Sequence, residues 1–392
     1  MRARGSFFVL ACLTGVACRS PYTVDPDYEA RHAGIAGVAG SGGTAGGAGA
    51  AGDAGTAGTG ASAGAAGDAG AAGDAGTGGG GTAGAGGFVW GVAKQSCIGL
   101  GPCDTGGGKS CCYSGTEPID GGVFPMGRGT DPGQDAYSYG TPNELPEHDI
   151  GVSTFALDFF EVTVGRFRRF IDGLDGAPPD GSGSHPKIAG TGWKPEWTPH
   201  LAPSSIRAGL TCHATLATWT DAPGKNERKP INCVDWYTAQ AFCIWDGGFL
   251  PTEAEREYAG AGGTKNRLYP WGLTPISPVY AAYDCTYAPG GGCTPDDLPN
   301  VGSFLAGIGS WGHLDLAGSV AEWVFDYYDV DWYKTGGASC TDCANLDETF
   351  QDRSVRGGGF MDVKSAQRAA ERSVYPPTTR FADIGFRCAR TP

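Results

Sequence analysis

The spacing of hydrophobic positions predicts two helices in the middle of the chain. After Thr163, apolar residues recur with the period of one helical face, at Val164, Phe167, Phe170, Ile171 and Leu174. A second helix is expected after Asp235, a favourable N-cap, and it runs through residues 236–246 to a stop at Gly247 and Gly248.

A third helix is predicted from a capping box, in which the side chains of Thr252 and Glu255 each accept a hydrogen bond from the backbone NH of the other residue. It ends in the glycines that follow Tyr258. Long loops rich in Gly, Pro, Asn and Asp separate these helices. Loops of that length inside a compact domain indicate a fold held by specific cross-links and not by regular layers.

The first 18 residues have the pattern of a secretory signal. Arg2 and Arg4 precede an apolar run at residues 7–16 that is too short to span a bilayer. The run ends at Cys18, in a context similar to the lipobox of bacterial lipoproteins, although Gly15 stands where the box prefers Leu. Lipidation of Cys18 and ordinary signal cleavage are the two interpretations. We expect an exported, lipid-anchored protein of the cell envelope, in the periplasm or at the outer membrane or cell surface.

The composition divides the rest of the chain into three parts. Residues 33–87 consist almost wholly of Gly, Ala, Ser, Thr and Asp, with a recurring AGDAG, so residues 19–87 are expected to form a disordered tether. Residues 88–116 hold four cysteines and are predicted to be a disulfide-stapled collar. Residues 117–392 form the globular domain. No later segment is apolar enough to span a membrane, so membrane attachment would be through the lipid anchor only.

Cysteine usage agrees with export. Of 14 cysteines, Cys12 and Cys18 belong to the signal region, and an even number remains for disulfides. Proximity in the sequence predicts the pairs Cys212–Cys233 and Cys285–Cys293. A zinc site would need two paired Cys or His units, and residues 340–343 provide a lone CxxC.

Charge and histidine spacing exclude several classes of function. The net charge is −14, from 28 Lys and Arg against 42 Asp and Glu, which disfavours nucleic acid as a partner. His313 and Asp315 have the HxD spacing of iron(II) oxygenases, but no later histidine completes that triad. Ten Trp, 17 Phe and 15 Tyr nevertheless indicate a substantial core.

A series of sequence blocks resembles the formylglycine-generating enzyme family, also called the sulfatase-modifying factor domain. The resemblance covers about residues 117–391. In order, the blocks are GGVFPMG (121–127), EVTVGRF (161–167), PINCVDW (230–236), LPTEAEREY (250–258), YPWG (269–272), GHLDLAGSVAEW (312–323), RGGG (356–359) and GFRC (385–388). The resemblance implies an α+β, C-type-lectin-like fold with much irregular loop. It also implies a disulfide between Cys243 and Cys388.

The resemblance implies a structural calcium site but no copper site. Asp315, Ser319 and Glu322, with the carbonyl of Ala317, match the oxygen ligands that the family uses for calcium, with Ser319 in place of the usual Asn. Catalytic members carry two cysteines after their Arg-Gly-Gly-Ser block, and these thiolates bind Cu(I). Here Asp362 occupies the first cysteine position, Gly359 occupies the serine position, and no cysteine lies between 343 and 388. Copper is therefore not expected as a cofactor, and no catalytic residue is assigned.

Six arginines gather in the last block, at positions 356, 368, 372, 380, 387 and 390. They either buttress acidic loops of the fold or form a basic floor for an anionic ligand. In the second interpretation the ligand groove is lined by Trp323, Phe360, Asp362, Arg368 and Tyr375.

Three functional hypotheses follow. The favoured one is a tethered, exported recognition module that binds a peptide or small-molecule ligand without copper chemistry. The second is an oxidoreductase of the same superfamily, acting either in sulfatase maturation by converting a protein cysteine to formylglycine or in a related metal-dependent oxidation. The third is a structural envelope protein without a ligand. The sequence leaves the ligand and the oligomeric state open.

Overall fold

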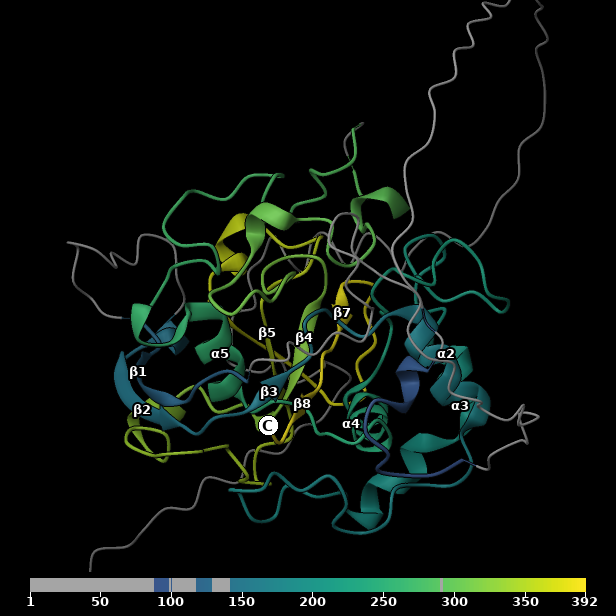
Figure 1. Ribbon diagram of the computed structural model, residues 1–392, viewed down its shortest axis with the longest axis horizontal. Coiled ribbons are helices and arrows are strands. Elements are labelled where there is room, and N and C mark those ends of the chain that lie inside the picture. Colours follow the sequence, from purple (N-terminus) through teal and green to yellow (C-terminus); the bar gives the residue numbers. More distant parts are fainter. Residues whose placement is uncertain (1–87, 99, 101–117, 129–141, 290–291) are drawn as a thin grey trace, which may run out of the picture. The chain divides into compact units, whose positions relative to one another are not determined.

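The computed structural model describes residues 88–392, except residues 99, 101–117, 129–141 and 290–291 (Figure 1). The predicted signal, Cys18, the tether and most of the Cys-rich collar lie outside the described residues. Within the part that is described, no helix has the length and apolar character needed to cross a membrane.

The three helices predicted from the sequence are present, with the expected ends. The described helices are α2 (Val164–Gly173), α3 (Pro203–Gly209), α4 (Trp236–Trp245) and α5 (Glu253–Ala261). Thr163 and Asp235 cap α2 and α4 with their side chains. The capping box of Thr252 and Glu255 is complete, and α5 stops at Gly262, whose φ is +72°. Short 3-10 helices fill parts of the loops at Gln95–Cys97, Pro142–Glu144, Pro195–Leu201, Gly263–Lys265, Pro295–Asp297, Leu305–Gly307, Trp332–Lys334 and Lys364–Gln367.

Within the described residues, the strands form one central sheet and two small ribbons. They are β1 (Gly122–Met126), β2 (His148–Val152), β3 (Ala156–Leu157), β4 (Ala321–Tyr327), β5 (Arg353–Arg356), β6 (Arg372–Tyr375), β7 (Ile384–Gly385) and β8 (Ala389–Arg390). The central sheet has the order β6-β5-β4-β7, with β4 and β7 parallel and the other pairs antiparallel. β1 pairs with β2, and β3 pairs with β8. Mixed helices and strands with long loops confirm the expected α+β class.

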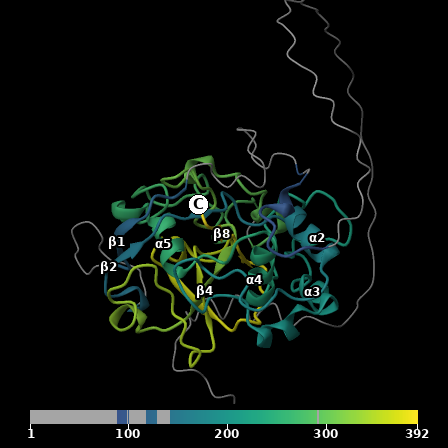
Figure 2. The same cartoon turned by 60° about the horizontal axis from the view of Figure 1, so that its bottom comes forward.

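The largest hydrophobic cluster lies between the helices and the central sheet. Figures 1 and 2 show α2, α3 and α4 on one side of β4, with α5 and the β1–β2 ribbon on the other. Phe167 on α2 stacks on Phe242 of α4, and Phe386 meets both rings edge-on. These aromatic contacts bring the end of the chain into the core beside the helices.

Four disulfides are present among the described residues, and they confirm three predicted pairings. Cys243 at the end of α4 is joined to Cys388, as the family resemblance implied. The two pairs predicted from proximity, Cys212–Cys233 and Cys285–Cys293, are also formed. The lone CxxC closes on itself as Cys340–Cys343.

Residues 88–98 pack onto the domain as an N-terminal strap. Phe88 stacks on Trp245 at the end of α4, with ring centroids 5.7 Å apart. The backbone NH of Ser96 donates to Asp246 Oδ1 at 2.8 Å, and Ser96 is completely buried. Arg166 on α2 donates to the Ser96 hydroxyl at 2.9 Å. This first part of the predicted collar is therefore integrated into the domain.

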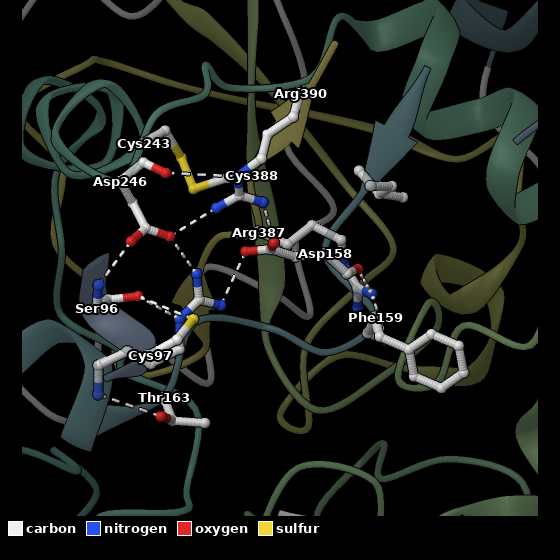
Figure 3. Close-up of polar contacts among 12 residues, drawn as sticks. Ser96, Cys97, Asp158, Phe159, Thr163, Cys243, Asp246, Arg387, Cys388 and Arg390 are labelled. Atoms are coloured by element: carbon white, nitrogen blue, oxygen red, sulfur yellow. Dashed lines mark hydrogen bonds and ion pairs between the residues drawn. A yellow bond between two sulfur atoms is a disulfide. The ribbon is translucent and has the colours of Figure 1, made fainter. Parts of the chain in front are cut away.

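A buried ion-pair network lies beneath the strap, beside the Cys243–Cys388 disulfide (Figure 3). Arg166 bridges Asp158 and Asp246 at 2.8 Å each, and Arg390 pairs with the same two carboxylates. Burial alone would raise the pKa of Asp158, but Arg166 and Arg390 together lower it to about 2. The network thus joins the strap, α2, the end of α4 and β8 through charges that all lie in the interior.

Among the four disulfides whose cysteines are both described, the pair Cys243–Cys388 should contribute most to stability, so replacing both by Ala should destabilise the protein most. The pair closes a loop of 145 residues, for which the chain-entropy model gives about 5 kcal/mol. Replacing Cys340 and Cys343, which lie three positions apart, should cost about 2 kcal/mol. Denaturant unfolding of both double variants measures the difference. Equal losses would show that the long loop is not the source of the stability.

The ionisation of Asp158 should stabilise the protein at neutral pH and cease to do so in acid. Its folded pKa of about 2 lies below the ordinary value of 3.8 for an aspartate, so the contribution is present above the unfolded pKa and is lost as pH falls through the folded pKa. It amounts to roughly 2 kcal/mol at pH 6. The stability gap between the native protein and an Asp158→Asn variant should therefore narrow between pH 6 and pH 2.5. A gap that stays constant over that range would contradict the pairing.

Candidate functional site

The residues that match the family calcium loop surround a buried cluster of charges. Glu322 on β4 is completely buried, and its carboxylate lies between two guanidinium groups. Arg256 on α5 pairs with Oε2 at 2.6 Å, and Arg387 pairs with Oε1 at 2.8 Å. Burial would raise the pKa of Glu322, but the two arginines hold it below its usual value.

Two further buried carboxylates, those of Asp315 and Glu161, interact electrostatically with Glu322 and Arg387. Asp315 accepts a hydrogen bond from the Gly302 NH at its Oδ2, at 2.5 Å, while its buried Oδ1 has no hydrogen-bond partner among the described residues. Glu161 accepts from the Ser319 hydroxyl and the Val320 NH, each at 2.9 Å. Burial and the charge of Asp315 raise the pKa of Glu161 well above its usual value.

We call Glu161, Asp315, Glu322, Arg256 and Arg387 the Asp315 cluster. Burial is the main cause that raises the pKa of Asp315, to about 6. Three carboxylates and two guanidinium groups leave one negative charge in excess when all are ionised. A cation or a proton must balance that excess, because an uncompensated buried charge is costly.

The geometry supports only part of the predicted calcium ligand set. Asp315 and Ser319 both have left-handed backbone angles, with φ of 56° and 65°, so the loop that contains Ala317 curls tightly. The unpartnered Oδ1 of Asp315 fits a hard cation. Both oxygens of Glu322 face arginines instead, which does not fit a metal ligand. Among the described residues, no three His, Cys, Asp or Glu side chains converge as a metal site requires.

The loop at the family cysteine position is closed by hydrogen bonds. Asp362 Oδ2 accepts from the backbone NH of Gly359 at 2.8 Å, and the Asp362 carbonyl accepts from the Asp284 NH at 2.8 Å. A Cβ on Gly359 would lie 2.7 Å from Cβ of Asp383, so the family serine could not occupy this position without a shift. Asp362 thus caps the turn that begins at Gly359.

The five residues predicted to line a ligand groove do not form one shared surface. Trp323 is completely buried and donates its indole NH to the carbonyl of Val234 at 2.8 Å. Phe360 is also completely buried, in a separate hydrophobic cluster. Arg368 is turned toward Glu144, and Tyr375 is half-buried against Trp323. Trp323 and Phe360 are therefore closed to a ligand in this structure because core packing covers both.

The arginines of the last block buttress the fold, which confirms the first of the two interpretations. Each pairs with a carboxylate, and none of the six lies on an open floor. The pairs are Arg356 with Glu253 and Glu257, Arg368 with Glu144 and Glu371, Arg372 with Glu253, Arg380 with Asp235, Arg387 with Glu322, and Arg390 with Asp158 and Asp246.

Comparison with known proteins decides the family. The sulfatase-modifying factor enzyme 1-like domain matches residues 113–392. The chain belongs to this family. It is 28% identical over 307 residues to a formylglycine-generating enzyme of Thermomonospora curvata, covering 71% of this chain and 94% of that protein. It is equally 28% identical, over 291 residues, to the inactive C-alpha-formylglycine-generating enzyme 2 of Bos taurus, covering 69% of this chain and 86% of that protein.

A solved structure, that of PvdO from Pseudomonas aeruginosa, is also similar to this chain. The sequence identity is 23% and the TM-score is 0.47, with coverage of 70% of this chain and 93% of that chain. The strap, residues 88–98, precedes the part that matches the sulfatase-modifying factor family.

Sequence reasoning missed Glu161 and Arg256 as members of the Asp315 cluster. Both belong to blocks that the family resemblance had already singled out, in EVTVGRF and LPTEAEREY. Every residue of α5 is buried, although four of its nine residues are charged. A helix with that many charged residues is usually exposed. The only sequence signal for its burial was that the chain contains both acidic and basic residues that could pair.

Replacing Glu322 by Gln should destabilise the protein by about 3–5 kcal/mol, because it removes the carboxylate that pairs directly with two buried guanidinium groups. Replacing Asp331 by Asn is a matched control, since its pair with Lys334 is exposed and should contribute less than about 1 kcal/mol. Urea unfolding of both variants measures the difference. A loss of less than 1 kcal/mol in the Glu322 variant would contradict the buried pairing.

Proposed function

We propose that this member of the sulfatase-modifying factor family is an exported, lipid-tethered recognition module without copper oxidase chemistry. The observation that carries the proposal is Asp362, which stands at the first family cysteine position and caps a turn through Gly359. A carboxylate is a hard ligand and does not replace a soft thiolate toward Cu(I). It also cannot form a mixed disulfide with a substrate thiol.

The described cysteine nearest to this turn does not supply a free thiolate. Cys285, whose backbone NH donates to the Phe360 carbonyl, is joined to Cys293, and the sequence neighbours Cys343 and Cys388 are joined to Cys340 and Cys243. The similarity to a protein named as an inactive family member supports retention of the scaffold without the oxidase reaction. The identity to a formylglycine-generating enzyme is equally 28%, so the proposal is supported by the cysteine positions and not by the degree of identity.

Export and tethering are supported by the N-terminal sequence and by the disulfides. The basic and apolar start ends at Cys18, and the Gly-rich segment that follows has the composition of a flexible tether. Four disulfides among the described residues suit an oxidising compartment. Lipidation of Cys18 would then place the domain at the end of a long polar chain anchored to a membrane.

Calcium is proposed as a structural ion beside Asp315. The excess negative charge of the Asp315 cluster and the unpartnered Oδ1 of Asp315 support it. Ser319 and the carbonyl of Ala317 would supply further oxygen ligands, while Glu322 stays with its two arginines. Bound calcium would hold the loop at residues 315–319 and offset the excess negative charge of the cluster.

Mass spectrometry of a cysteine peptide tests the proposal. The purified protein, incubated in air with Cu(I) and a sulfatase-motif peptide, should leave the cysteine unchanged, while the Thermomonospora curvata enzyme serves as the positive control. Metal analysis of the same preparation should find calcium, and an Asp315→Ala variant should lose it. Formation of the aldehyde peptide would overturn the assignment as a module without oxidase chemistry. Absence of calcium from both the native protein and the Asp315→Ala variant would overturn the calcium assignment but not the absence of oxidase chemistry.

A further inference from the structure

A surface pocket lies where the strap meets the domain. Its volume is about 290 Å³, and its walls come from the strap, the loop at residues 179–184, the end of α4 and the C-terminal end of the chain. Trp90 and Gly91 of the strap line it together with Ser182, Ser184, Phe249 and Thr391. None of these residues belongs to the predicted groove or to the family cysteine position.

The aromatic wall of the pocket is held in place by its neighbours. Phe88 and Phe170 both meet Trp90 in T-shaped contacts, with ring centroids 5.0 and 6.3 Å away. Phe249 is buried, and its backbone pairs with Ala389 in both directions. A ligand would therefore meet an aromatic surface that is already ordered, which lowers the entropic cost of binding.

The polar wall consists of hydroxyl and backbone groups. Ser182 and Ser184 each donate to a carbonyl of their own turn, at Pro179 and Gly181, and this leaves the lone pairs of their oxygens available as acceptors. Ser184 and Thr391 are exposed at the mouth. At Gly91 an added Cβ would have no atom within 4 Å, so the wall is open on that side.

The charge and size of the pocket restrict its ligand. Among the described residues that line it, none carries a charge, so an ionic ligand would lose its hydration without gaining a countercharge. The volume of about 290 Å³ lies at the lower end of small-molecule sites and admits about one ring. A ring with an apolar face for the aromatic wall and hydroxyl groups for the serines satisfies both walls.

We propose that this pocket binds a neutral sugar residue. The apolar C–H face of the sugar packs on Trp90, and its hydroxyl groups donate to Ser182 and Ser184 and bond to the backbone at the mouth. The site goes beyond the proposed function, because it depends on the strap, which lies outside the family match. Recognition at this site needs neither copper nor the Asp315 cluster.

Saturation-transfer NMR and calorimetry test the site with a defined panel of probes. The panel holds glucose, galactose, mannose, N-acetylglucosamine, cellobiose and N,N′-diacetylchitobiose, with glucuronic acid as the charged analogue and N-acetylphenylalanine amide as the peptide-like ring. At least one neutral sugar should bind with a Kd near the millimolar range, as a single ring permits. Glucuronic acid should bind at least tenfold more weakly.

Two variants and one control locate the binding. Trp90→Ala removes the aromatic wall, and Thr391→Trp fills the mouth from an exposed position at the chain end; each should weaken sugar binding at least tenfold. Ile98→Ala is the matched control, because Ile98 lies on the strap, is 72% exposed and does not line the pocket. It should bind within twofold of the native protein.

Several results would overturn the assignment. The first is a panel in which no neutral sugar binds with a Kd below 20 mM (roughly a −2 kcal/mol limit). The second is tighter binding of N-acetylphenylalanine amide than of every sugar. The third is sugar binding that the Thr391→Trp substitution leaves unchanged. The Thr391 variant keeps the test valid if Trp90→Ala loosens the strap. None of these results produces an aldehyde, so failure here is distinct from failure of the proposed function.

Discussion

Pairing of buried arginines with buried carboxylates is the constraint on which the structure depends. Arg372, Arg387 and Arg390 come from the last part of the chain, while their partners Glu253, Glu322 and Asp158 lie on distant elements. Because an unpaired charge in the interior costs several kcal/mol, each pair forms only when the C-terminal segment has docked in its native register. The Cys243–Cys388 disulfide joins the C-terminal segment covalently to α4.

Local sequence signals were enough to predict the helices. The pairing of residues that are distant in the sequence could not be predicted. The caps at Thr163, Asp235 and Thr252 act within a few residues, so sequence shows them directly. The burial of all of α5 was not evident, because its charged residues resemble a solvated face until the positions of Arg356 and Arg372 are known. The candidate site was foreseen at Asp315 and Ser319, whereas Glu161 and Arg256 become part of it through tertiary contacts alone.

The chain has the sulfatase-modifying factor domain, and the loop at the predicted family cysteine position has a structural role. Gly359 lies too close to Asp383 for a side chain, and Asp362 closes the turn through the Gly359 NH. Of the predicted groove residues, Trp323 and Phe360 lie in two separate core clusters. The strap at residues 88–98 forms part of the wall of a surface pocket, away from the predicted groove residues.

The affinity of the purified protein for Cu(I) tests the central claim most directly. A competition titration against a chromophoric Cu(I) chelator, run under anaerobic conditions on the native protein and on Asp362→Ala, reports whether any soft-metal site exists in the folded, disulfide-bonded chain. The account predicts that both proteins leave the chelator fully loaded and give superimposable curves. Withdrawal of one equivalent of Cu(I) from the chelator by the native protein would contradict it.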